Sequence, residues 1–226
     1  MKKLILLLFI PLVFACGNDS KKEEDKKIST TKEVIEYYDS GSIKSKSNID
    51  VDGKKQGKQV WYYESGAVKS KVYYVNDKLQ GEVIGYHETG AVYYRYNATD
   101  GNLQGEVIEY YESGQIEKKV NFVDGKKSGE EIWYYESGQI EKKVNFVDDK
   151  KSGEEIGYYE SGAIKGIGNN VDGNLQGEAI EYYESGSIQW RWNYVDNRLQ
   201  GLSIEYYENG EVKSVRNYKN DVLIKD

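Results

Sequence analysis

The apolar and polar positions of this chain follow a short pattern that is typical of strands. Val107-Ile108-Glu109-Tyr110-Tyr111 is rich in β-branched and aromatic residues, and Ile116 to Val123 alternates between apolar and polar positions. Glycine or Asp-Gly bounds both runs, and neither has the 3.6-residue apolar spacing of a helix. The pattern therefore predicts two strands joined by a turn, which is a β-hairpin.

The same pattern returns along the chain. Its signature is two tyrosines, an acidic residue, a small polar residue, a glycine, any residue and then Ile or Val. The copies begin at Tyr37, Tyr62, Tyr86, Tyr110, Tyr134, Tyr158, Tyr182 and Tyr206, and are 24 residues apart from the second copy onward. A period of this length is typical of repeat arrays. We expect an all-β fold, an elongated array of about eight 24-residue β-hairpin repeats forming one long antiparallel sheet over residues 33–226.

Two turns alternate in each repeat. Glu112-Ser113-Gly114-Gln115 reads as a tight hairpin turn, and Asp124 to Gly129 as a longer, looser return. A two-residue loop at Ser113-Gly114 is the preferred register, and it sets Tyr111 opposite Ile116, Glu109 opposite Lys118 and Val107 opposite Val120. A three-residue loop would instead set Tyr110 against Ile116.

Two further columns bear on the sheet. An asparagine recurs at one position, which suits a ladder of stacked amides, at Asn48, Asn97, Asn121, Asn145, Asn169, Asn193 and Asn217. The sixth copy departs from its neighbours, because Gly166-Ile167-Gly168-Asn169 replaces longer side chains. We expect a bend or a weak point there.

The repeated pattern is Gly-x-x-x-x-Tyr-Tyr-Glu-Ser-Gly-x-Ile, followed by an aromatic residue and Asp-Gly-x-x-x-Gly. It resembles the bacterial variant of the MORN repeat. The resemblance covers Glu33 to Asp226, about 85% of the chain. It implies an all-β array of hairpins. Bacterial proteins of this kind are often named as antitoxins of toxin–antitoxin systems, and the more distant eukaryotic MORN proteins are linked to membrane association and scaffolding. The resemblance implies no catalytic or ligand residue.

The N-terminus reads as a secretion signal. Lys2 and Lys3 precede an apolar run, Leu4 to Phe14, that is too short to span a bilayer. Val13-Phe14-Ala15-Cys16 looks like the lipobox of bacterial lipoproteins, which predicts a signal peptide over residues 1–15 and a lipid anchor on Cys16. A secreted protein with an incidental cysteine is the alternative.

Residues 16–32 combine the lipidated cysteine with a flexible charged tether. The acidic run after Cys16 resembles the export signal that sends lipoproteins of Bacteroidota to the outer face of the outer membrane, although a plain solvated linker explains it equally well. We expect a lipoprotein of the cell envelope, in the outer membrane.

Charge and composition exclude several classes of function. Loss of Lys2 and Lys3 with the leader leaves 29 basic against 38 acidic residues, a net charge of −9, which disfavours nucleic-acid binding. His87 is the one histidine and Cys16 the one cysteine, so a transition-metal site and an internal disulfide are not expected. The acidic residue of the signature recurs in every copy, as a structural column would. We expect no catalytic residue, no cofactor and no metal.

The candidate binding residues are aromatic. The predicted interaction surface comprises Trp61, Tyr63, Tyr111, Trp133, Tyr135, Tyr159, Tyr183, Trp190 and Trp192. Rigid aromatic side chains bind proteins and also stack on sugar rings, whereas the structural alternative is that they pack between neighbouring hairpins. Three functions stay open: docking of a protein partner, which is preferred, binding of carbohydrate by a surface lipoprotein, and neutralisation of a toxin.

Overall fold

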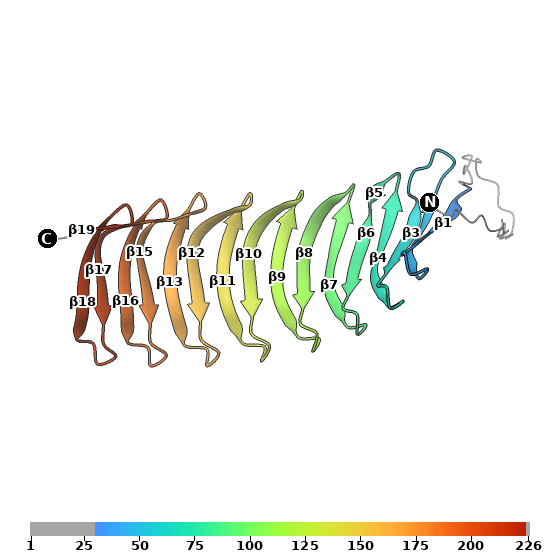
Figure 1. Ribbon diagram of the computed structural model, residues 1–226. Helices are drawn as coiled ribbons and strands as arrows, with labels where there is room; N and C mark the ends of the chain where they lie inside the picture. Colours follow the sequence, from blue (N-terminus) through green and yellow to red (C-terminus); the bar gives the residue numbers. More distant parts are fainter. Residues whose placement is uncertain (1–29, 225–226) are drawn as a thin grey trace, which may run out of the picture.

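The computed structural model describes residues 30–224 as one antiparallel sheet of 19 strands (Figure 1). The leader, Cys16 and most of the tether lie outside these residues. The strands are β1 (Lys32–Tyr37), β2 (Ile43–Ile49), β3 (Gly57–Tyr62), β4 (Val68–Val75), β5 (Lys78–Leu79), β6 (Gly81–Tyr86), β7 (Val92–Thr99), β8 (Asn102–Tyr110), β9 (Ile116–Val123), β10 (Lys126–Tyr134), β11 (Ile140–Val147), β12 (Lys150–Tyr158), β13 (Ile164–Val171), β14 (Asn174–Leu175), β15 (Gly177–Tyr182), β16 (Ile188–Val195), β17 (Arg198–Tyr206), β18 (Val212–Lys219) and β19 (Val222–Ile224). The predicted all-β array of hairpins is confirmed.

Each hairpin joins its strands through a three-residue loop. Tyr111 N–H donates to the Gln115 carbonyl at 2.8 Å, and Gly114 N–H donates to the Tyr111 carbonyl at 2.9 Å, with φ at Gly114 of 87°. Tyr110 therefore pairs with Ile116, and the expected pairing of Tyr111 with Ile116 is wrong. A register shift between Glu109 and Tyr110 then restores the other predicted pairs, Glu109 with Lys118 and Val107 with Val120.

The return between repeats is the tighter of the two turns, which corrects the expectation of a loose one. Asp124 and Gly125 have φ values of 50° and 80°, and β9 and β10 pair directly on either side of them. Two central residues with positive φ make a type I′ turn, whose twist matches that of the flanking strands. Asp, Asn and Gly hold the two positions in the other returns from Asn76 onward, because they tolerate this conformation. The first return, closed between Asp50 and Lys54, is one residue longer.

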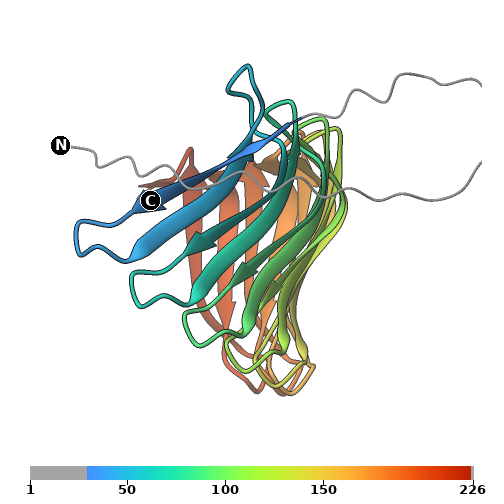
Figure 2. The ribbon, with the colours of Figure 1, turned by 90° about the vertical axis from the view of Figure 1, so that its right-hand side faces the viewer.

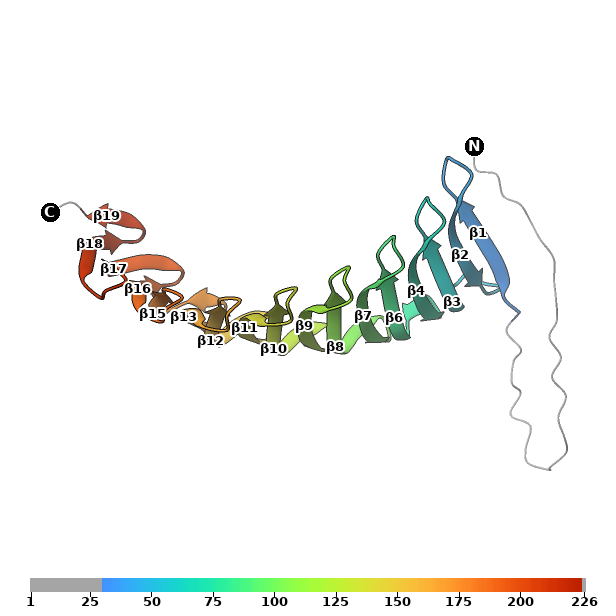
Figure 3. The same ribbon diagram turned by 90° about the horizontal axis from the view of Figure 1, so that it is seen from below.

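A second irregularity follows each return. The register of β10 against β9 shifts between Lys127 and Glu131. Such a bulge bends the strand and increases its twist, and the strands are curved in Figure 2 while the whole array arcs to one side in Figure 3. The Asn121 amide donates to the Ser128 carbonyl within this bulge, at 3.1 Å. The asparagine column thus bonds to the neighbouring backbone here, and likewise at Asn48 and Asn193, instead of forming the expected ladder.

The two faces of the sheet differ in burial. One face, which we name the core face, carries the positions of Val107, Glu109, Lys118, Val120 and Phe122. The outer face carries Ile108, Tyr110 and their equivalents. In the part of the chain that the structure describes, every buried residue larger than glycine lies on the core face, namely Ser45, Gln59, Val72, Val83, Ala98, Val107, Val120, Glu131, Val144, Phe146, Asn170, Ala179 and Ser203.

Hydrogen bonds tie the returns of successive repeats together. The Asp149 carboxylate accepts from Lys127 N–H at 2.8 Å, and Asp149 N–H donates to the Lys127 carbonyl at 3.0 Å. The Gln104 amide makes a similar reciprocal pair with Asp124, at 2.8 and 2.9 Å. The returns are therefore linked to one another from repeat to repeat.

Candidate functional site

The four tryptophans of the predicted surface all lie on the core face. Trp61 and Trp133 stand at the position of Glu109, while Trp190 and Trp192 stand at the positions of Lys118 and Val120, and all four are half-buried. Trp190 and Trp192 stack, with ring centroids 5.4 Å apart and planes 5° from parallel.

Trp133 lies within a polar setting. Its indole N–H donates to Glu131 at 2.9 Å. The Lys118 ammonium lies 4.8 Å from the ring centroid and forms an ion pair with Glu109. A cation over the face of an indole is attracted by the negative charge density of the ring. This half-buried ring is therefore held in place from two sides.

The tyrosines of the predicted surface lie elsewhere, in the turn that closes each hairpin. Each hydroxyl donates to the carbonyl of the first tyrosine in the next repeat, at 2.6–2.9 Å. The donors are Tyr63, Tyr111, Tyr135, Tyr159 and Tyr183, and Tyr38 makes the same bond to Tyr62. We name this row of links the tyrosine rim, and it ties the hairpin ends of the array together.

His87 takes the place of the tyrosine in its repeat. Its Nε2 lies 3.2 Å from the Tyr110 carbonyl and donates to it in the tautomer with a proton on that nitrogen. The ring also packs against Tyr93, with centroids 4.8 Å apart. The contacts of His87 are thus those of a rim residue.

The rim raises the pKa of several phenols. Burial raises the pKa of Tyr111, Tyr135 and Tyr159, and nearby carboxylates raise it further. The anion would have to give up its hydrogen bond to a carbonyl, since it has no proton to donate. These hydroxyls therefore remain donors over a wide range of pH.

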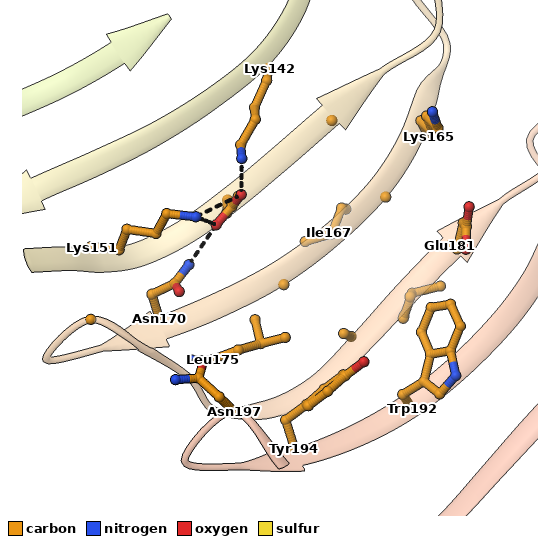
Figure 4. A pocket seen from close by; sticks show the side chains of 17 residues that line it. Lys142, Lys151, Lys165, Ile167, Asn170, Leu175, Glu181, Trp192, Tyr194 and Asn197 are labelled. Atoms are coloured by element: carbon orange, nitrogen blue, oxygen red, sulfur yellow. Dashed lines mark hydrogen bonds and ion pairs between the residues drawn. The ribbon is translucent and has the colours of Figure 1, made fainter. Parts of the chain in front are cut away.

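The sixth repeat contains a hollow in the core face (Figure 4). Gly157 pairs directly with Gly166, and Gly168 follows on the same face. The hollow has a volume of about 570 Å³ and is lined on one side by Trp192 and Tyr194 of β16. We expected a bend or a weak point in this repeat. Instead, β12 and β13 pair along their length, and the repeat differs from its neighbours in the side chains that its glycines lack.

A polar cluster forms the opposite side of the hollow. The Glu155 carboxylate accepts from Lys151 at 2.9 Å and from the Asn170 amide at 3.1 Å, and it forms an ion pair with Lys142. Burial raises the pKa of Glu155, but the hydrogen bonds from Lys142 and Lys151 outweigh it and hold the pKa below its usual range. The cluster is therefore ionised and internally paired near neutral pH.

Two other features, a metal cluster and a membrane-spanning helix, are absent from the part of the chain that the structure describes. Residues 30–224 contain no group of three or more His, Cys, Asp or Glu that could hold a metal ion. Among the same residues, no helix has the length and apolar character needed to cross a membrane.

Comparison with protein families gives a match in five repeats. The model of the MORN repeat variant matches residues 55–76, 103–124, 127–148, 175–196 and 199–220. These five segments are therefore similar to the MORN repeat variant. The copies that begin at Tyr37, Tyr86 and Tyr158 lie outside the matched ranges. The copy from Tyr86 contains His87, and the copy from Tyr158 contains Gly166 and Gly168 of the hollow. The comparison with curated proteins gives no match.

Among solved structures, the chain is similar to "Crystal Structure of TcdB2-TccC3", at 11% identity and a TM-score of 0.21, over 83% of this chain and 14% of that one. It is also similar to "Crystal Structure of TcdB2-TccC3-Cdc42", at 12% identity and a TM-score of 0.18, with the same coverage. The chain thus spans only 14% of the length of either structure.

The structure separates the predicted surface into two groups. The tryptophans share the core face, whereas the tyrosines form a rim of repeat-to-repeat links. The hollow was missed as a site, although its glycines were visible in the sequence. The signal that could have revealed the hollow is the direct pairing of Gly157 with Gly166, which can be recognised only when the register of the hairpin is known.

Proposed function

We propose that this chain is a non-enzymatic, lipid-anchored protein of the cell envelope whose core face docks another protein. The observation that carries the proposal is that all four tryptophans lie on one face, and that this face differs from repeat to repeat. The position of Lys118 is held in turn by Ser45, Ser70, Tyr94, Lys118, Lys142, Gly166, Trp190 and Ser214. On the outer face, the position of Ile108 is Ile or Val and that of Tyr110 is Tyr in every repeat.

Repeated and varied positions have different physical uses. Identical side chains in neighbouring repeats stack on one another and stabilise the sheet. Varied side chains give each part of the surface its own shape and charge, which is what recognition of one particular partner requires. Tryptophan, tyrosine and arginine also contribute most of the binding energy in protein interfaces. The varied, aromatic core face is therefore the better docking surface.

The core face also lacks a covering layer in the part of the chain described. A sheet normally buries a face against a second layer of structure. Here residues 30–224 supply a single sheet (Figure 1), so that Trp61, Trp133 and Trp192 remain only half-buried. Docking of a partner would supply the missing layer.

The anchor is proposed from the leader, with Cys16 as the lipidated residue and outer-membrane attachment as the expected location. A charged tether would join Cys16 to β1 and leave the sheet accessible. Replacement of Cys16 by Ser is expected to move the protein from the membrane fraction to the soluble fraction. Continued partition into detergent would contradict the anchor.

The docking is tested by crosslinking in intact cells that express a tagged protein, followed by purification and mass spectrometry. Trp61→Ala and Trp133→Ala on the core face are expected to weaken recovery of the partner by roughly 30-fold or more, as for loss of about 2 kcal/mol at an interface hot spot. Lys119→Ala and Lys143→Ala on the outer face are the matched controls. Equal recovery from all four variants would overturn the proposal, and a toxin recovered as the specific partner would identify the chain as an antitoxin.

A further inference from the structure

We propose that the hollow in the sixth repeat receives an aromatic side chain of the protein partner, which presupposes the docking on the core face proposed above. The hollow would then be the anchoring point of the interface, and the side chain that it accepts would be an uncharged ring of the size of tyrosine.

The third repeat shows how this sheet holds such a ring. Gly85 pairs directly with Tyr94, and the Tyr94 ring lies so close over Gly85 that a Cβ there would overlap it. Tyr94 also stacks on Tyr96, with ring centroids 5.8 Å apart and planes 20° from parallel. An aromatic side chain thus fills the space above a strand glycine on the core face.

The sixth repeat has the same glycine without the ring. Gly157 is the equivalent of Gly85, while Gly166 and Gly168 stand where the third repeat has Tyr94 and Tyr96. A Cβ added to Gly157 would meet no atom within 4 Å. The space that Tyr94 fills from within the chain is therefore open to a ring from outside.

The walls of the hollow favour an aromatic occupant. Trp192 and Tyr194 stand on one side (Figure 4), where ring–ring contacts contribute about 0.5–1.5 kcal/mol beyond the burial of area. The volume of about 570 Å³ leaves ample room for one ring, since pockets for small ligands measure roughly 300–1,000 Å³.

The charges around the hollow favour an uncharged anchor over a basic one. Lys142, Lys151 and Lys165 line it together with two carboxylates, Glu155 and Glu181. A lysine or arginine of the partner would therefore meet a net positive charge, and Glu155 is already engaged by two of the lysines. An uncharged ring meets no such repulsion.

The test measures binding of a free aromatic probe to the purified protein. Saturation-transfer NMR with N-acetyl-L-tyrosinamide is expected to detect binding to the wild type. In Gly166→Tyr, which recreates the arrangement of Gly85 and Tyr94, binding is expected to fall at least tenfold. A Cβ at position 166 would lie 3.3 Å from the Ile180 carbonyl oxygen, so the melting temperature is measured alongside to show that the variant is folded. Gly157→Trp provides a second filled variant, because Trp61 and Trp133 already occupy the equivalent position, and Gly157→Ala is its small control.

Other outcomes would overturn the inference. If N-acetyl-L-leucinamide bound as tightly as N-acetyl-L-tyrosinamide, the hollow would have no preference for an aromatic ring. If methyl β-glucopyranoside alone bound, the hollow would be a sugar site. Absence of any binding, or equal binding to both filled variants, would remove the site itself. Capture of the protein partner equally by wild type and Gly166→Tyr would refute the anchor and leave docking intact, whereas capture of no partner by the wild type would refute docking.

Discussion

At the scale of single residues, the second tyrosine of the signature links each repeat to the next through its hydroxyl. The bond joins residues 23 positions apart, from Tyr135 to the Tyr158 carbonyl at 2.7 Å. The sequence identified this tyrosine but assigned it to a binding surface, because its partner carbonyl becomes a neighbour only when the repeats stack. The four tryptophans could be placed on strands from the sequence, because Trp61 and Trp133 lie in the β-branched and aromatic run, and Trp190 and Trp192 in the alternating run.

Tyr135→Phe is expected to destabilise the array by roughly 0.5–1.5 kcal/mol, because the Tyr158 carbonyl loses its hydrogen bond from the hydroxyl. Thermal and urea unfolding measure the change. Tyr207→Phe is the matched control, since the half-exposed Tyr207 makes no side-chain hydrogen bond among residues 30–224. Equal losses in the two variants would show that the rim bonds contribute nothing of their own.

The Glu155 cluster predicts a loss of stability in acid. The pKa of Glu155 is lower in the folded protein than its ordinary value, so the folded state favours the ionised carboxylate. The stability that Glu155 contributes is complete above the ordinary glutamate pKa of about 4.3 and is lost as the pH falls through the lowered folded value. Melting temperatures measured from pH 7 to pH 3 should fall less steeply for Glu155→Gln than for the wild type. The exposed Glu154→Gln should follow the wild-type curve.

At the scale of the hairpin, turn type was the part of the fold that the sequence left open. A glycine at position 114 fits a two-residue loop and a three-residue loop equally well, because both place it at positive φ. The pairing of Glu109 with Lys118 does not distinguish the two loops either, because the register shift next to the three-residue loop restores this pair. Asp-Gly was recognised as turn-forming, but the glycine that follows at position 129 suggested a longer loop where the chain makes a bulge in β10.

Gly114→Ala tests the three-residue loop. With φ at 87°, an alanine there is strained, and the loss of stability is expected to be about 1–2 kcal/mol. Ser113→Ala, in the same loop, should change stability by less than about 0.5 kcal/mol, as for an ordinary surface site. Denaturant unfolding of the two variants checks the difference, and a tolerated Gly114→Ala would argue against this loop.

At the scale of the whole molecule, the period of 24 residues is set by the contacts between neighbouring repeats. Hydrogen bonds between repeats join residues 22 positions apart at the returns and residues 23 positions apart at the hairpin turns. The repeat sequence therefore predicted the array and its strands, because the same turn and strand residues recur in every repeat. The hollow could not be predicted in this way, since it depends on which residues of different strands meet.

Deletion of residues 103–126, which is one full period, is expected to give a shorter array that folds, with a lower melting temperature because one set of neighbour contacts is lost. Deletion of residues 103–125 leaves one residue too many, which would move side chains to the wrong face of the sheet. Circular dichroism and unfolding should therefore separate the two deletions. Equal folding of both would mean that the period does not set the stacking.

The proposed docking depends most on which face of the sheet meets the partner. Trp133 and Tyr134 are adjacent aromatic residues on opposite faces, so a photoreactive phenylalanine at either position is a conservative change. Crosslinking in cells is predicted to join the partner to position 133 on the core face and not to position 134. Crosslinks from position 134 without any from position 133 would contradict the central claim.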